Sequence, residues 1–266
     1  MTGLLKIATP ISSLFADTQS AQEILACSDC LECRDHSPQA DWPRQELFHT
    51  DIQPIHPISE EEWDYLRKIR EAKPGLKLLS MHMASCCDQP VLRGGRFEPG
   101  GKTYGKNELL ARARENLAGI RKLFGSQVEL AVENNNYYPT PAYQCVCDAG
   151  FISEIVRENR LRFLFDVAHA HITSINQGVD YEEYRRQLPL EALVQVHLCR
   201  HGINGNGQAY DAHELPGHAE FCEVEELANR HPFNYLTIEY YKDANGLVSA
   251  LREASKIKNE IAGATV

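Results

Sequence analysis

The sequence has no long uninterrupted apolar run. No window offers the roughly 18 consecutive apolar residues that a membrane-spanning helix needs. The N-terminal segment 1–17, MTGLLKIATPISSLFAD, lacks the basic start, long apolar region and small-residue cleavage site of a signal peptide. These absences predict that the protein has no membrane partner and is cytoplasmic.

Basic residues are fewer than acidic ones. The chain has 27 Lys and Arg residues against 37 Asp and Glu residues, which gives a net charge of −10 over 266 residues. An acidic surface repels phosphate backbones, so we expect no nucleic-acid partner. Apolar residues make up 43% of the chain, which is enough for a sizeable core.

A disulfide framework is not expected either. The nine cysteines are odd in number and have no secretory context, so most are expected to be reduced thiols in the core. Cys27, Cys30 and Cys33 are spaced by three, with His36 close behind, and such a cluster could hold zinc or part of an iron–sulfur cluster. A second cysteine pair at matching spacing is missing, so we favour packing on one helical face.

Short β-like runs alternate with longer amphipathic segments along the chain. Strands are predicted at 4–9, 51–56, 76–82, 128–134, 162–168, 193–198 and 235–240. Helices are predicted at 59–72, 106–125, 151–160, 180–188, 220–230 and 244–262, the first with Ser59 as its N-cap. With no internal repeat and no linker, residues 1–266 are expected to form a single domain.

This alternation predicts an α/β protein with a parallel sheet covered by helices. An open doubly wound sheet and a closed barrel both fit the pattern. An eighth strand, which a barrel needs, could lie near Leu14 or Leu47.

The polar residues at the strand ends separate the two architectures. Six predicted strands end at or near a metal-ligand residue: His56, His82, Glu133, Asp166, His197 and Glu239. Three more candidates lie in the loops just beyond, namely His169, Asp211 and His213. In a barrel the C-terminal strand ends converge on one face, where barrel active sites are built, whereas an open sheet spreads them along an edge. We therefore predict a (β/α)8 TIM barrel.

Nine such residues at one mouth indicate a metal centre. Each alone could be a hydrogen-bonded loop residue or a helix cap, but clustered carboxylates without a cation repel one another. A mixed set of imidazoles and carboxylates suits zinc, iron or manganese. Nine ligands are too many for one ion, so two or three ions are expected, with Glu133 as the bridging carboxylate.

Several motifs around these residues resemble one superfamily. The spacing that includes Asp166-x-x-His169 and Asp211-x-His213 resembles the xylose-isomerase-like barrels, in which endonuclease IV and the multinuclear non-heme iron-dependent oxidative enzymes (MNIOs) carry this fuller set. LSMHMA resembles the MNIO Ser-x-His-Leu segment, VENNNYY its Glu-Asn-x-x-x-Tyr segment and YDAHE its Asp-Thr-His-Asp segment. The likeness runs from about His56 to about Leu247 and favours the MNIO family.

The resemblance implies how the ligands are shared among ions. The three sets it implies are His56, His82 and Glu133; Glu133, Asp166, His197 and Glu239; and His169, Asp211 and His213. His49 is a weaker alternative to His56, because both precede the helix at 59–72. Residues that could orient ligands or substrate are Asn135, Tyr137, His171 and His201.

The same resemblance implies an oxidase of natural product biosynthesis. Its cofactors would be two or three mixed-valent iron ions, favoured over zinc, with O2 as co-substrate. The substrate would be a residue of a peptide, cysteine or similar, or a small amino-acid-derived molecule, and a separate protein could recognise it. The alternatives are a trinuclear zinc phosphodiesterase like endonuclease IV, a metal-dependent sugar isomerase or epimerase, and a barrel that only binds a peptide or metal.

Overall fold

Eight parallel strands close into a barrel whose neighbours follow the order β1-β12-β9-β8-β7-β4-β3-β2. The computed structural model describes residues 5–37 and 41–264, so Leu4, the first residue of the strand predicted at 4–9, lies outside the described residues. The strands are β1 (Lys6–Pro10), β2 (Cys30–Arg34), β3 (Gln45–Thr50), β4 (Leu78–Met81), β7 (Glu129–Glu133), β8 (Arg162–Asp166), β9 (Leu193–Leu198) and β12 (Tyr235–Ile238). The predicted TIM barrel is confirmed.

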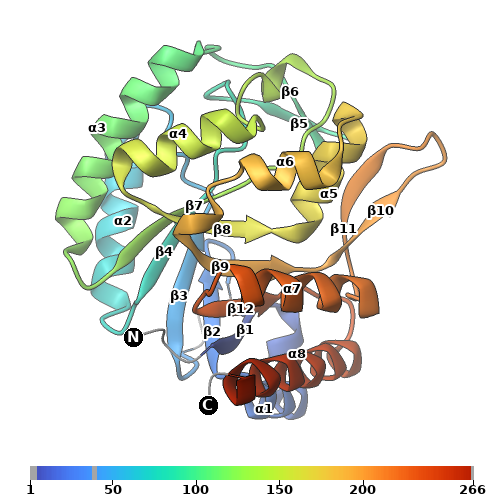
Figure 1. Ribbon diagram of the computed structural model, residues 1–266. Coiled ribbons are helices and arrows are strands. Elements are labelled where there is room, and N and C mark those ends of the chain that lie inside the picture. Colours follow the sequence, from blue (N-terminus) through green and yellow to red (C-terminus); the bar gives the residue numbers. More distant parts are fainter. Residues whose placement is uncertain (1–4, 38–40, 265–266) are drawn as a thin grey trace.

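Helices surround the barrel (Figure 1). They are α1 (Thr18–Cys27), α2 (Glu60–Ala72), α3 (Lys106–Phe124), α4 (Ala149–Asn159), α5 (Val167–Gln177), α6 (Tyr181–Gln187), α7 (His218–Arg230) and α8 (Ala244–Ala264). Short 3-10 turns occur at η1 (Ser13–Ala16), η2 (Pro141–Tyr143) and η3 (Leu190–Ala192). All six predicted helices are present, and Ser59 caps α2 in a reciprocal capping box with Glu62. Neither α1 nor α5 was predicted.

The strand predicted at 51–56 is wrong. That segment is a loop, and the strand lies earlier in the sequence, at β3. Leu47, one of the two suggested places for an eighth strand, lies in β3. Buried Ile52 and Ile55 make the segment apolar enough to resemble a short strand. Pro54 lies between them, and proline cannot donate to a ladder between two neighbouring strands. Leu14, the other suggested place, lies in η1.

Strand β2 was missed because its sequence, CLECR, was read as a cysteine motif. Cys27 ends α1, whereas Cys30 and Cys33 both lie in β2. Residues three apart in a strand point to opposite faces. Cys30 accordingly packs inside the barrel and Cys33 packs on the outer side. The three thiols therefore do not share a helical face, and no metal-ligand group among the described residues includes them.

The barrel interior is built in two layers. The lower layer takes one buried residue from each strand: Ala8, Cys30, Leu47, Leu78, Ala131, Leu164, Val194 and Tyr235. Two residues further along, six of these strands carry buried polar side chains that point inward: Glu32, His49, Ser80, Glu133, Asp166 and Thr237. An apolar plug thus supports a polar layer at the C-terminal mouth.

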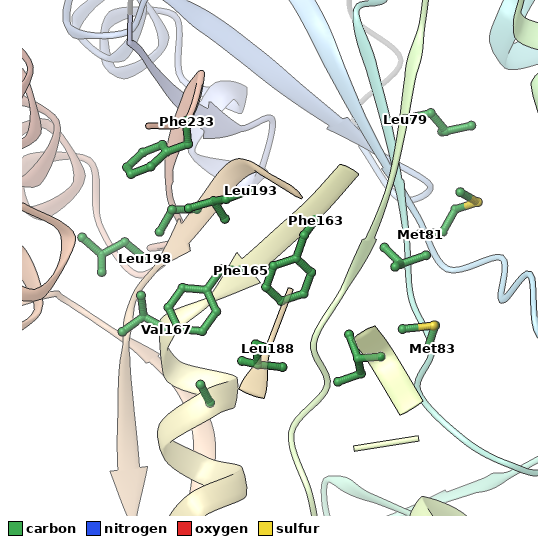
Figure 2. Packing of buried hydrophobic residues seen from close by; sticks show 14 of the residues in the cluster. Leu79, Met81, Met83, Phe163, Phe165, Val167, Leu188, Leu193, Leu198 and Phe233 are labelled. Carbon is green, nitrogen blue, oxygen red and sulfur yellow. The ribbon is translucent and has the colours of Figure 1, made fainter. Parts of the chain in front are cut away.

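The alternate residues of the strands pack outward against the helices. Figure 2 shows part of this outer core, with Phe163 and Phe165 of β8 near Val167 and Leu188. Asp166 points into the barrel, whereas its sequence neighbours Phe165 and Val167 pack in the outer core. The outer core therefore holds in place the strand that carries this carboxylate.

Two hairpins extend beyond the barrel strands. They are β5 (Val91–Arg93) with β6 (Arg96–Glu98), and β10 (Arg200–Ile203) with β11 (Ala209–Glu214). The second projects from the barrel on one side of Figure 1. Among the described residues, no helix is both long and apolar enough to cross a membrane.

Candidate metal centre

The polar layer brings imidazoles and carboxylates together around Glu133, at the end of β7. Its side chain is buried, and its two oxygens face different groups of residues. Glu133 Oε2 lies 3.0 Å from His82 Nδ1 and 3.4 Å from His49 Nε2. Glu133 Oε1 lies 3.2 Å from His197 Nδ1 and 3.8 Å from His169 Nδ1. One carboxylate therefore joins two sets of imidazoles.

His49, His82 and Glu133 form the first group of possible ligands. The Nε2 atoms of the two imidazoles face each other at 2.8 Å. His49 Nδ1 is hydrogen-bonded to Ser80 Oγ at 2.8 Å, which fixes the ring and turns Nε2 toward Glu133. Burial, together with His82, lowers the pKa of His49 to about 4. His49 is therefore neutral near pH 7, as a metal ligand must be.

His56 does not lie in this group. It belongs to the loop after β3, with its ring 5.6 Å from that of Tyr104 between centroids. His49 follows Leu47 by two residues in β3 and so points into the same interior, whereas His56 follows it by nine. The structure places His49, the weaker alternative in the sequence, where His56 was expected.

A second group surrounds the other oxygen of Glu133 and consists of Glu133, Asp166 and His197. His197 Nδ1 also lies 3.0 Å from Glu239 Oε1. Asp166 caps α5 through its Oδ1, which accepts from the His169 backbone N–H at 2.6 Å. Its Oδ2 is buried and has no hydrogen-bond partner, and burial raises the pKa of this carboxyl to about 6.

A third group links α5 to the β10–β11 hairpin. His169 Nε2 lies 3.5 Å from Asp211 Oδ2, and Asp211 Oδ1 lies 3.4 Å from His213 Nδ1. His169 Nδ1 donates to the Asn134 carbonyl at 3.0 Å, which leaves Nε2 free to face Asp211. His213 Nε2 in turn lies 3.4 Å from Glu239 Oε2. Eight of the nine predicted ligands thus lie in one continuous cluster, with His49 in place of the ninth.

Two charged residues of β2 complete the cluster and were not anticipated. Glu32 is fully buried and accepts from His197 Nε2 at 3.0 Å and from Gln195 Nε2 at 2.5 Å. Arg34 donates to Glu32 Oε1 at 2.8 Å and also contacts Glu239 Oε1. Both would have been found had CLECR been recognised as a strand, because Glu32 and Arg34 share its inward face.

Glu32 determines how His197 faces the centre. Its carboxylate accepts a hydrogen bond from Nε2, which turns Nδ1 toward Glu133 and Glu239. His197 Nδ1 is buried and has no hydrogen-bond partner. Burial opposes protonation, but Glu32 and Glu133 raise the pKa of His197 to about 9. Carboxylates behind metal-binding imidazoles orient them in this way.

The predicted orienting residues separate into two sets. Asn135 is buried beside the centre and donates to the Ala84 carbonyl at 2.8 Å. Tyr137 packs near Tyr143, with 6.2 Å between ring centroids. His171 and His201 belong to a different cluster, where His171 stacks on Tyr181 at 3.8 Å and bonds Glu223.

A cavity of about 470 Å³ opens onto the centre. Its lining combines cluster residues, including His82, Glu133 and Asp211, with Leu92 and Phe97 of the β5–β6 hairpin. This volume lies in the range of small-molecule sites. The cavity gives a substrate side chain access to the oxygens and imidazoles of the cluster.

The donor set fits metal ions. Of the five carboxylates in the cluster, Glu32 and Glu239 pair with the guanidinium of Arg34. Three buried ligand atoms lack hydrogen-bond partners, namely Glu133 Oε2, Asp166 Oδ2 and His197 Nδ1. A buried polar group without a partner costs free energy of about 1–3 kcal/mol. Cations among these atoms would remove that cost, and the imidazole and carboxylate donors suit transition metals.

Comparisons with known proteins identify the family of the chain. A family model described as "RiPP precursor modification enzyme MbnB/TglH/ChrH" matches residues 58–262. A UPF0276 protein of Streptomyces avermitilis is 28% identical over 142 residues, which is 53% of this chain and 28% of that protein. One from Vibrio vulnificus is 24% identical over 131 residues, 48% of this chain and 45% of that protein. The matched part thus spans less than half the length of these relatives.

Solved structures share the fold at low identity. The 3-keto-D-glucoside 4-epimerase YcjR of E. coli superposes with a TM-score of 0.61 at 12% identity, over 96% of this chain and 99% of that one. A D-allulose 3-epimerase of Methylomonas sp. in complex with D-allulose gives 0.58 at 14% identity, over 96% and 98%. These likenesses concern the fold. The match over 58–262 confirms the family predicted from the motifs, and this chain belongs to the MbnB/TglH/ChrH family of RiPP precursor modification enzymes, the MNIOs.

Proposed function

We propose that this chain is a multinuclear iron-dependent oxidase that uses O2 to modify a residue of a peptide. The single observation that carries the proposal is the position of Glu133. One of its oxygens faces His49 and His82, and the other faces His197. A carboxylate shared in this way suits two adjacent metal ions rather than one.

The ligands are proposed in three sets. The first ion takes His49, His82 and Glu133; the second takes Glu133, Asp166, His197 and Glu239; a third takes His169, Asp211 and His213. The first set replaces His56 with His49. The first and third sets both line the cavity, so a substrate could reach either ion.

Iron is proposed over zinc because the family modifies peptides and the donors are imidazoles and carboxylates. Bound iron supplies the redox capacity to activate O2 and oxidise a substrate, which zinc lacks. The chain's own residues orient the imidazoles through Ser80, Glu32 and the Asn134 carbonyl. The barrel beneath excludes water from the lower side of the centre.

The cavity supports a peptide residue as substrate. Its volume of about 470 Å³ accommodates a side chain and its flanking backbone, and Leu92 and Phe97 offer apolar contacts at its edge. The family's substrates, precursor peptides, fit this description. A separate recognition protein is part of the proposal, as the family resemblance implies.

A sugar epimerase is the second candidate, favoured by the fold likeness alone. Glu133, Asp166, His197 and Glu239 would suffice for its single ion. The first and third ligand sets would then have no purpose. A DNA-cutting zinc enzyme is disfavoured by the net charge of −10.

The test begins with anaerobic purification, elemental analysis and Mössbauer spectroscopy. Two or three irons per chain, in mixed ferrous and ferric states, with O2 consumed in the presence of a precursor peptide, would support the oxidase. A single divalent ion with exchange of a sugar C–H proton and no O2 uptake would establish the epimerase instead. Stoichiometric zinc with cleavage of abasic DNA would overturn both.

A further inference from the structure

Cys199 lies at the edge of the proposed centre, and its surroundings differ from those of an ordinary core thiol. It follows β9 directly, two residues after His197, and its side chain is 1% exposed. Its sulfur, a nitrogen of His213 and an oxygen of Glu239 all lie within 4.8 Å of one another. The nine ligands predicted from the sequence are all His, Asp or Glu, so Cys199 was not among them.

The contacts around Cys199 are those of a metal site. Cys199 Sγ lies 4.0 Å from Asp211 Oδ1, and His213 Nε2 lies 3.4 Å from Glu239 Oε2. Three donors of different chemistry therefore converge from β9, β11 and the end of β12. By contrast, the buried thiol of Cys33 packs in the outer core and donates to the amide oxygen of Gln45.

The backbone of His213 gives an independent sign of a functional constraint. Its φ is +42°, in the left-handed region that residues other than glycine rarely adopt. Such strain costs about 1–3 kcal/mol and persists where the surrounding structure holds it. Here the strained residue turns its imidazole toward Glu239 and Asp211 at the hairpin's end.

We propose that Cys199 is a thiolate ligand of the metal ion held by His213, with Glu239 as a further ligand of the same ion. The assignment rests on the proposed metal centre and adds a sulfur donor to it. On binding, the S–H bond breaks, its proton passes to solvent and a metal–sulfur bond forms, with no change of oxidation state. A thiolate among imidazoles and carboxylates makes this ion softer and more electron-rich than its neighbours.

Cobalt reports directly on sulfur ligation, because cobalt(II) bound to a thiolate shows a sulfur-to-metal charge-transfer band in the near ultraviolet. We expect the metal-stripped chain titrated with Co²⁺ to develop this band beside the visible bands of bound cobalt. Cys199→Ala should lose the ultraviolet band while retaining bound cobalt at the other positions. Cys33→Ala, a matched buried thiol outside the centre, should keep it.

Other outcomes would overturn the assignment. If wild-type protein binds cobalt without the band, or if Cys199→Ala retains it, Cys199 is a packing residue and the metal centre stands without it. If neither cobalt nor iron binds, the proposed function fails as well. Should Cys199→Ala fail to fold, X-ray absorption of zinc-loaded wild-type protein decides the question. A sulfur neighbour at about 2.3 Å is expected, and its absence would contradict the proposal.

Discussion

Two layers of the barrel interior come from the same strands, two residues apart, yet differ completely in chemistry. The lower layer is almost entirely apolar, with residues such as Leu47, Leu78 and Leu164 buried from each side. Burial of each such side chain contributes about 1.5–3 kcal/mol to stability. The upper layer holds carboxylates and imidazoles, whose burial costs several kcal/mol per ion unless they are compensated.

This contrast separates the tasks of the barrel. The lower layer stabilises the fold, and the upper layer concentrates negative charge that bound metal ions would balance. A substitution in the lower layer should therefore change the free energy of unfolding without changing metal content. A substitution in the upper layer should mainly change metal content.

Glu133→Ala should have the largest effect. Because each oxygen of Glu133 faces a different set of imidazoles, its removal should release at least two metal ions per chain and abolish activity. Elemental analysis and circular dichroism measure metal content and folding. The matched control is Glu46→Ala, which removes a carboxylate paired with Lys6 at the opposite end of the barrel. Equal metal loss in both variants would contradict the bridging role.

His49→Ala should remove about one ion per chain, whereas His56→Ala should leave metal content unchanged. His49 lies 3.4 Å from Glu133, and His56 packs beside Tyr104. Elemental analysis of the two variants in parallel distinguishes them. The reverse result would restore the assignment made from the motifs.

The exchange of His56 for His49 shows which parts of the site could be predicted from the sequence. The motifs predicted the barrel, and eight of the nine predicted ligands lie in the cluster, because residues that end hydrophobic β-like runs are easily recognised. His49 was ranked below His56 because the apolar residues Ile52 and Ile55 led to a predicted strand that ended at His56. Glu32 was not predicted as part of the site, because a charged residue between cysteines does not follow the usual pattern of a buried strand.

Leu164→Ala tests the lower layer. Leu164 is fully buried and lies two residues before Asp166 on β8. Its truncation should reduce the free energy of unfolding by about 2–5 kcal/mol through lost contacts and a cavity. Metal stoichiometry at low temperature should stay the same. Denaturant titration and elemental analysis measure both, and loss of metal without loss of stability would refute the division between layers.

Glu32→Gln should weaken metal binding without emptying the centre. The amide still fits beside His197 but loses the charge that holds its Nε2 proton and part of the Arg34 contact. Loss of such a partner lowers metal affinity by about 10–100-fold. A competition titration against a chelator measures the affinity, with Glu46→Gln as the control. Unchanged affinity would show that Glu32 serves only to pack the barrel.

The smallest effect concerns the stability of the metal-free chain as pH rises. Between Glu32 and Glu133, the pKa of folded His197 rises to about 9, against about 6.5 in the unfolded chain. His169 shifts in the same direction, because Asp166 and Glu133 outweigh its burial. A raised pKa stabilises the fold fully below pH 6.5, and this contribution is lost as pH rises toward 9.

The window is cleanest between about pH 7 and 8. The pKa of Asp166 is about 6 and that of His49 about 4, so the contributions of both are largely complete by about pH 7. Buried thiols such as Cys33, whose pKa is raised to about 11, lower stability mainly near and above about pH 8.5, where they ionise in the unfolded chain. The Tm of chelator-treated protein should therefore fall by several degrees between pH 7 and 8. Metal-loaded protein should not show this fall, because the cation replaces the protons of His169 and His197. A flat or rising Tm in the stripped protein would mean that these imidazoles are already neutral between their carboxylates.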